Sequence, residues 1–188
     1  MTGDNATNGT NTPSGVGIRP IERGDADQVT ALLQSNAASR GGALFGEYPE
    51  EKVEAMSFGE GTQAVVAVRG GKVVGVLFGL SLTSPHPPII TAMLAAYPGG
   101  RGRYVYGPVC IDVSERGRGL LRSLYDALSL RFSGLEAVLF IREDNTASRK
   151  AHESLGMKPV SRFSFDSADY TVFSDGPRSS EAARPIVL

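Results

Sequence analysis

Apolar residues recur along this chain with two periods, one typical of strands and one typical of helices. The clearest strand pattern is a hairpin over residues 63–82, in which QAVVAVR and KVVGVLFGL flank Gly70 and Gly71. Two adjacent glycines supply the positive φ angles of a tight hairpin turn. Further strands are predicted at 17–22, at 104–111, at 136–141, and at 163–166 and 170–174, the last two joined through 167–169.

The helical period appears between these strands. Asp25 and Gln28 have the spacing of a capping box, which predicts a helix start just before the apolar face of Val29, Leu32 and Leu33. Other helices are expected near 50–56, at 89–97, at 119–132 and at 146–155. The 119–132 helix has one apolar stripe, made of Leu121, Leu124, Leu128 and Phe132. The 146–155 helix is expected to turn Ala147, Ala151 and Leu155 inward.

Strands and helices in this order predict an α/β (α+β) fold with a mixed sheet covered by helices. The 188 residues are enough for one domain, which we expect over 16–175. Residues 1–15 contain almost no apolar side chains and are expected to be a disordered tail, and 176–188 a C-terminal tail.

Composition excludes several classes of protein. The net charge is −1, which disfavours a nucleic-acid-binding protein. No apolar run approaches the length of a membrane span, and no signal peptide opens the sequence, so we expect no membrane association. The single cysteine, Cys110, forms no internal disulfide and fits a reducing cytoplasm; with no histidine nearby in sequence, we interpret it as a packing residue. No metal-ligand spacing occurs, so no metal is expected.

The candidate chemistry begins where the strand 104–111 ends. Arg116-Gly117-Arg118-Gly119 follows that strand and precedes a helix. The backbone N–H groups at a helix start are unpaired and lie at the positive end of the helix dipole, which suits a phosphate. By itself this loop is also compatible with an ordinary strand-to-helix connection that carries surface arginines.

A second motif follows the next strand and narrows the ligand. It contains Asn145, Ser148 three residues later, His152 four residues after that, and then Gly156-Met157. The two motifs together, each placed after a strand, resemble those of the GNAT superfamily of acetyl-CoA-dependent N-acyltransferases. The resemblance covers residues 104–157 and implies a mixed, mostly antiparallel sheet of about six to seven strands flanked by helices.

The resemblance implies acetyl-CoA as cosubstrate and assigns it a set of binding residues. Main-chain groups of Ile111 and Val113 would hold the pantetheine arm and the thioester carbonyl, as an added strand pairs with a sheet edge. Asn145 and Ser148 would steady the arm from the other side. The pyrophosphate would bind the glycine-rich loop and helix start, which comprise Arg116, Gly117, Arg118, Gly119, Leu120 and Leu121.

The resemblance also implies direct attack of an amine on the thioester in a ternary complex, for which proximity supplies much of the rate. The family's usual acid is a tyrosine at the position of His152, so His152 is a candidate acid, alongside the interpretation of a helix-surface histidine. Tyr170 is a substitute acid on a later strand. Asp112 and Glu115 are candidate bases, and a water chain is an equal alternative.

Two departures from the family pattern, Leu121 and His152, motivate a second hypothesis. The leading function is an N-acetyltransferase for a primary amine, either a small molecule or a protein amine. The alternative is a catalytically weak or inactive acyl-CoA-binding sensor with the same fold. A nucleotide-dependent oxidoreductase is disfavoured because the loop lacks Gly-x-Gly-x-x-Gly spacing. A homodimer is implied by the resemblance alone.

Overall fold

The computed structural model describes residues 15–98 and 102–176 of the chain. The expected tails at 1–15 and 176–188 lie outside this part except for their innermost residues, Gly15 and Gly176. Seven strands form one sheet in the order β1-β2-β3-β4-β5-β7-β6. They are β1 (Gly17–Pro20), β2 (Thr62–Arg69), β3 (Lys72–Ser81), β4 (Arg103–Ile111), β5 (Glu136–Arg142), β6 (Lys158–Phe165) and β7 (Ala168–Ser174). Neighbours are antiparallel except for β4 and β5, so the expected mixed, mostly antiparallel sheet is confirmed.

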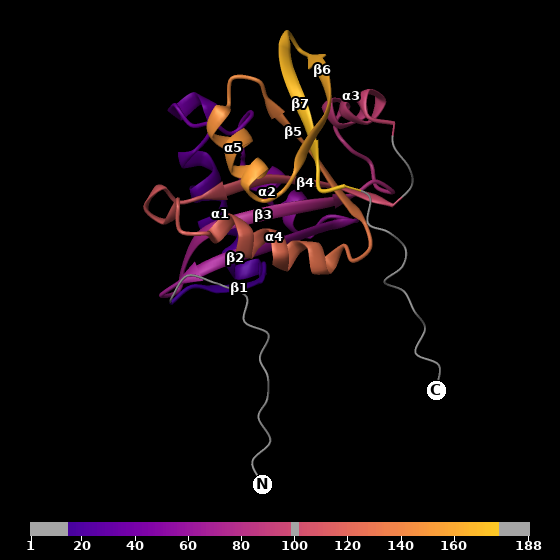
Figure 1. Cartoon of the computed structure of the whole chain (residues 1–188). Helices are drawn as coiled ribbons and strands as arrows, with labels where there is room; N and C mark the ends of the chain where they lie inside the picture. The colour runs from indigo at the N-terminus through magenta and orange to yellow at the C-terminus, as the bar shows by residue number, and fades with distance from the viewer. Residues whose placement is uncertain (1–14, 99–101, 177–188) are drawn as a thin grey trace, which may run out of the picture.

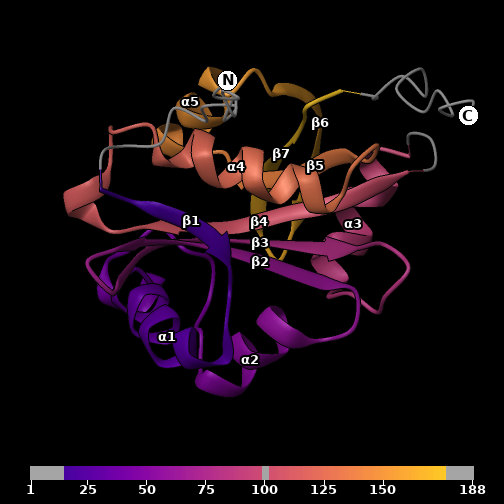
Figure 2. The same cartoon turned by 90° about the horizontal axis from the view of Figure 1, so that it is seen from below.

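Helices cover both faces of this sheet. Figure 2 shows α4 and α5 on one face and α1 and α2 on the other, while α3 lies beside β6 in Figure 1. The helices are α1 (Ala26–Ser35), α2 (Glu50–Phe58), α3 (Pro88–Ala96), α4 (Leu120–Arg131) and α5 (Thr146–Ser154). Three apolar clusters fill the spaces between these layers: under α4, under α1 and α2, and between α3 and β5–β7.

The hairpin forms as the sequence predicts. Gly70 and Gly71 both have positive φ, 55° and 79°, and connect β2 to β3. The final hairpin differs from expectation, because its turn is made by Asp166 and Ser167, both with positive φ, so that β6 and β7 are longer than predicted.

The capping box predicted from Asp25 and Gln28 is wrong. Asp25 instead forms a capping box with Glu22 across a short 3₁₀ turn, in which each side chain accepts a bond from the backbone N–H of the other residue. Its carboxylate also accepts two hydrogen bonds from Arg19, of 2.6 and 2.8 Å. Gln28 reaches across to the hairpin, where its Oε1 accepts a bond from Val73 N–H at 2.9 Å. A tertiary contact therefore replaces the local one.

The α4 stripe packs against glycines of β3. A Cβ added to Gly79 would lie 2.4 Å from Phe132 Cε2, and Phe132 is itself stacked on Tyr104 with ring centroids 4.1 Å apart. The stripe begins at Leu120, which is 1% exposed, rather than at Leu121, which is half-buried. Close approach of helix and sheet therefore requires a residue without a side chain at position 79.

We expect Gly79→Ala to destabilise the fold by about 1–3 kcal/mol, because the added methyl overpacks a filled site. Urea unfolding measures the change. The matched control is Gly24→Ala, where an added Cβ meets nothing within 4 Å and φ is not positive; its effect should stay within about 0.5 kcal/mol. Equal stabilities of the two variants would contradict the packing described here.

Candidate functional site

The central sheet opens between β4 and β5. These strands pair only through Arg103–Val105 and Glu136–Val138, and no further pair joins them among the described residues. In β4, Gly107 and Pro108 stand opposite the single residue Phe78, which is the arrangement of a β-bulge. The bulge begins two residues after the last β4–β5 pair, at Val105, and beyond that pair β4 presents an unpaired edge toward β5.

The backbone direction along this edge follows from one hydrogen bond. Asp112 N–H donates to Val74 O at 2.9 Å and thus points toward β3. Because backbone groups alternate sides along a strand, Ile111 and Val109 direct theirs toward the opening. Val113, expected to share this role, lies beyond the strand in a 3₁₀ turn and is 75% exposed. Val109 is not among the residues expected to hold the pantetheine arm, although the alternation of the predicted strand identifies it.

The glycine-rich loop reaches the start of α4 with an open surface. Gly117 and Gly119 have φ of 73° and 81°, and a Cβ at either would meet nothing within 4 Å. The first bond of α4 runs from Arg122 N–H to Gly119 O at 3.1 Å. The N–H groups of Leu120 and Leu121 precede this bond and have no acceptor within the helix. The loop therefore presents backbone donors, at the positive end of the α4 dipole, to an anion.

Two arginines flank this loop in different ways. Arg116 turns back to donate from Nε to Ile111 O at 3.1 Å and from Nη2 to Asn36 Oδ1 at 2.7 Å. The side chain of Arg118 is 60% exposed, with its nearest acid, Glu115, 3.8 Å away. Glu115 is buried and binds Arg69 at 2.7 Å. This ion pair holds the turn beneath the loop and leaves Glu115 poorly placed to serve as a base.

The start of α5 faces the same opening from the β5 side. Asn145 Oδ1 accepts a bond from Ser148 N–H at 3.1 Å, so the interpretation of Asn145 as an N-cap is confirmed. Its Nδ2 has no partner among the described residues and remains available as a donor. Asn145 is thus able to cap the helix and bind a ligand carbonyl at the same time.

His152 is buried, not on the helix surface. It is 2% exposed, and its ring lies edge-on to Tyr106 with centroids 5.5 Å apart. Nδ1 lies 2.8 Å from Ser148 O, which assigns the proton of the neutral ring to Nδ1 and leaves Nε2 as a buried acceptor without a partner among the described residues. Burial lowers the pKa of His152, so the ring is neutral at pH 7. The inward face of α5 is therefore centred on His152, while Ala147 is exposed.

Tyr170 lies on the opposite face of the sheet. It is 1% exposed, stacks on Phe163 with centroids 5.2 Å apart, and meets the edge of Phe45 at 6.3 Å. Its hydroxyl has no partner among the described residues, and burial raises its pKa, which keeps it protonated. His152 and Tyr170 thus lie on opposite faces of the sheet.

Asp112 is engaged in a turn. Its carboxylate accepts bonds from Ser114 N–H at 3.0 Å and Ser114 Oγ at 2.7 Å, and these bonds lower the pKa of Asp112. A carboxylate stabilised in its charged form is a weak base. Cys110 is buried, and burial raises the pKa of its thiol to about 12, in agreement with a packing role.

Tyr106 is a further polar residue that the sequence reasoning missed. It is 2% exposed, and its hydroxyl has no partner among the described residues. Burial raises its pKa well above the usual value, so the hydroxyl stays protonated. Tyr106 and His152 therefore place a buried donor and a buried acceptor beside the opening, and only the tertiary structure brings them together.

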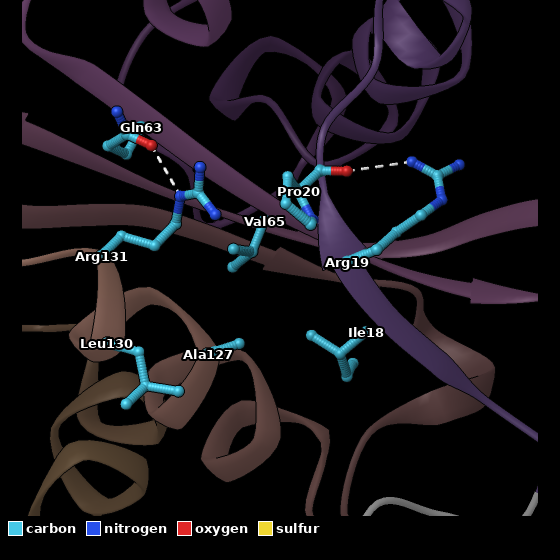
Figure 3. A pocket seen from close by; sticks show the side chains of 8 residues that line it. All are labelled: Ile18, Arg19, Pro20, Gln63, Val65, Ala127, Leu130 and Arg131. Atoms are coloured by element: carbon cyan, nitrogen blue, oxygen red, sulfur yellow. Dashed lines mark hydrogen bonds between the residues drawn. The ribbon is translucent and has the colours of Figure 1, made fainter.

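Other features of the described residues lie apart from this site. A hollow of about 450 Å³ is bounded by β1, β2 and α4, and none of the predicted site residues lines it (Figure 3). No group of three or more His, Cys, Asp or Glu side chains within 15–98 and 102–176 is arranged to hold a metal ion. Within the same residues, no helix is both long and apolar enough to traverse a bilayer.

The buried neutral state of His152 predicts a pH-dependent stability. Because the pKa of His152 is lower in the folded protein than in the unfolded chain, protonation favours the unfolded chain. The contribution of His152 to the free energy of unfolding is therefore fully present above about pH 6.5 and is lost as the pH falls below that value. The slope should reach up to about 1.4 kcal/mol per pH unit. Urea unfolding at pH 5–8 should show this decline, and His152→Phe should remove it. The decline should persist in His86→Asn. If it disappeared in that variant, His86 and not His152 would be its cause.

Similar proteins were found only through structure. No protein-family model and no curated protein sequence matches the chain. Among solved structures, smu.2055 from Streptococcus mutans UA159 is similar with a TM-score of 0.66 and 20% identity, over 84% of this chain and 97% of that one. A putative acetyltransferase from Salmonella typhimurium, yncA with its cofactor acetyl-CoA, has a TM-score of 0.64 and 18% identity, over 93% and 100%.

A third neighbour carries a more specific name. The ribosomal-protein-S18-alanine N-acetyltransferase of Escherichia coli is similar with a TM-score of 0.63 and 15% identity, over 92% of this chain and 99% of that one. In each case the likeness spans nearly the whole neighbour. Together with the strand order and the two loop motifs, these comparisons show that the chain has the fold of the GNAT superfamily of N-acetyltransferases.

Proposed function

We propose that this protein is an N-acetyltransferase that transfers an acetyl group from acetyl-CoA to a primary amine. The observation that carries the proposal is the juxtaposition of an unpaired β4 edge with an open, glycine-rich helix start. A pantetheine arm requires the first and a pyrophosphate the second. The yncA neighbour contains acetyl-CoA, which supports the same ligand for this chain.

The residues present fit acetyl-CoA at each point. Backbone donors from Gly117 to Leu121 would receive the pyrophosphate, and the exposed Arg118, which lies 3.8 Å from Glu115, would extend over it. Val109 and Ile111 would pair with the pantetheine arm, and Asn145 Nδ2 would donate to one of its carbonyls. Arg116 occupies one lone pair of Ile111 O and leaves the other for the arm. Leu121 contributes an N–H, so its side chain does not remove a phosphate donor.

The bound thioester supplies an activated acetyl group. The protein's own groups would stabilise charge, donate a proton and orient the pantetheine arm. A backbone N–H at the β4 bulge would stabilise negative charge that develops on the carbonyl oxygen. Tyr170, a protonated hydroxyl on the side away from α5, would donate a proton to the departing thiolate. His152, neutral and with Nε2 unpaired, is suited to accept a hydrogen bond and would orient the arm. The amine loses its proton to water, because Asp112 and Glu115 are engaged in turns.

Calorimetric titration with acetyl-CoA followed by a thiol-release screen tests this function. Amines, amino acids and peptides serve as candidate acceptors. Binding with turnover of at least one acceptor class is the expected result. Absence of binding at millimolar acetyl-CoA contradicts the proposal, and tight binding without turnover across the whole panel favours a sensor.

A further inference from the structure

A single guanidinium group joins the glycine-rich loop to the end of α1. Arg116 donates from Nη2 to Asn36 Oδ1 at 2.7 Å and from Nε to Ile111 O at 3.1 Å. Asn36 ends α1 and lies 80 residues earlier in the chain. Arg116 therefore connects the proposed cofactor loop with a segment that takes no part in cofactor binding.

Asn36 holds that segment closed. Its carbonyl accepts a bond from Leu44 N–H at 3.2 Å, and its Nδ2 donates to Leu32 O at 2.9 Å. The chain between them folds tightly against Asn36, since a Cβ added to Gly42 would lie 1.8 Å from Asn36 O. Gly42 N–H donates to Ala37 O at 2.9 Å and completes the loop. The position of Asn36 thus sets the path of residues 37–44.

The same loop delivers Phe45 to the face of the sheet that carries Tyr170. Phe45 directly follows Leu44, is 50% exposed, and presents its ring edge-on to Tyr170 at 6.3 Å. Tyr48 donates from its hydroxyl to Phe45 O at 3.0 Å. Phe45 therefore forms an exposed wall beside the proposed acid.

We propose that Asn36 is a positioning residue that couples cofactor binding to the order of the acceptor-side loop, residues 37–45, through its bond with Arg116. The inference rests on the proposed function. When phosphate binds the N–H groups of 117–121, the backbone next to Arg116 becomes fixed, and its guanidinium then holds Asn36 more firmly. Phe45 is thereby held in place before the acceptor arrives. Such coupling is reciprocal, so an acceptor that orders Phe45 also strengthens cofactor binding.

The loop has the properties of a segment that opens locally. Its backbone hydrogen bonds are local, except for the bond from Leu44 N–H to Asn36 O, and Gly41, Ala43 and Phe45 are exposed. Amide hydrogen exchange reports such opening directly. The Arg116–Asn36 bond is already present without coenzyme A, so the most that its strengthening can add is the worth of one hydrogen bond. That worth corresponds to about a three- to tenfold change in exchange rate, which is the upper limit of the expected effect.

The experiment is hydrogen–deuterium exchange of the full chain with and without coenzyme A as the probe. In the wild type, coenzyme A should slow exchange at 117–121 through direct contact. It should also slow exchange at Gly42 and Leu44, by up to about three- to tenfold. In Asn36→Ala, protection of 117–121 should remain and that of Gly42 and Leu44 should be lost. Asn36→Asp keeps an acceptor for Arg116 but loses the Nδ2 donor to Leu32 O. Exchange of the loop without coenzyme A should therefore be faster in this variant, while coenzyme A should still slow it.

Arg116→Met provides a second test, because it removes the bridge without altering any bond inside the loop 37–45. It should also lose the protection of Gly42 and Leu44. Protection of 117–121 alone in the wild type overturns the coupling and leaves the proposed function standing. Protection of the loop that persists in both Asn36→Ala and Arg116→Met likewise overturns it. No protection at any position contradicts the proposed function itself.

Discussion

Gly119→Glu should lower the affinity for coenzyme A at least about 100-fold. The residue lies at the N-terminal end of α4 with φ of 81°, among the backbone donors proposed for the pyrophosphate. A glutamate there places negative charge and bulk where phosphate must approach, and it offsets the positive end of the helix dipole. A loss of this size corresponds to about 2.7 kcal/mol, as expected when an anion site is both blocked and reversed in sign. Calorimetric titration with coenzyme A measures it.

Gly134→Glu is a matched control for this substitution. Gly134 has φ of 80°, is exposed, and has nothing within 4 Å of an added Cβ, as at Gly119. Both variants therefore carry the same backbone strain, about 1 kcal/mol, and the same added charge. Only Gly119→Glu should lose coenzyme A binding. Equal affinities in the two variants would contradict the phosphate site at the start of α4.

Tyr170→Phe should lower kcat about 100-fold with an acceptor found in the thiol-release screen, with little change in affinity for acetyl-CoA. The reason is loss of the proposed proton donor to the leaving thiolate. Because the Tyr170 hydroxyl has no partner among the described residues, its removal breaks no hydrogen bond of the fold. Thermal stability should be unchanged or slightly higher, which separates a catalytic effect from misfolding.

Tyr106→Phe is the comparison for Tyr170→Phe. It also removes a buried hydroxyl without a partner among the described residues, but on the α5 side of the opening, next to His152. A modest change in kcat is expected for Tyr106→Phe. If instead Tyr106→Phe lost the greater part of kcat and Tyr170→Phe retained it, the acid would lie on the α5 side and the assignment of Tyr170 would be wrong.

Local sequence patterns were sufficient where local chemistry decides the structure. The Gly70-Gly71 turn, the helix following Gly119 and the N-cap at Asn145 each depend on residues within four positions of one another. Local patterns gave wrong predictions where a side chain binds or packs against a segment far away in the sequence. Gln28 binds the β2–β3 hairpin instead of capping α1, and Leu120 instead of Leu121 begins the α4 stripe because the sheet lies on that side.

Roles of individual polar residues depended most on tertiary structure. A histidine four residues after Ser148 has the same sequence context whether it is exposed or buried, yet burial beside Tyr106 decides its protonation. Asp112 and Glu115 are both plausible bases in sequence. The bond between Asp112 and Ser114 is a local turn contact, whereas the bond between Glu115 and Arg69 is visible only in the fold, because Arg69 lies on a strand 46 residues earlier.

The fold class, the glycine-rich helix start and the second motif at Asn145 follow from the amino-acid pattern, because turn residues and helix starts are encoded by neighbours along the chain. The divergence of β4 from β5, the backbone groups that face the opening and the side chains that flank it are set by tertiary contacts. These depend on a bulge opposite Phe78 and on contacts between segments far apart in sequence, among them Arg116 with Asn36 and Phe45 with Tyr170. Such contacts form through burial and packing of the whole chain, and no local pattern specifies them.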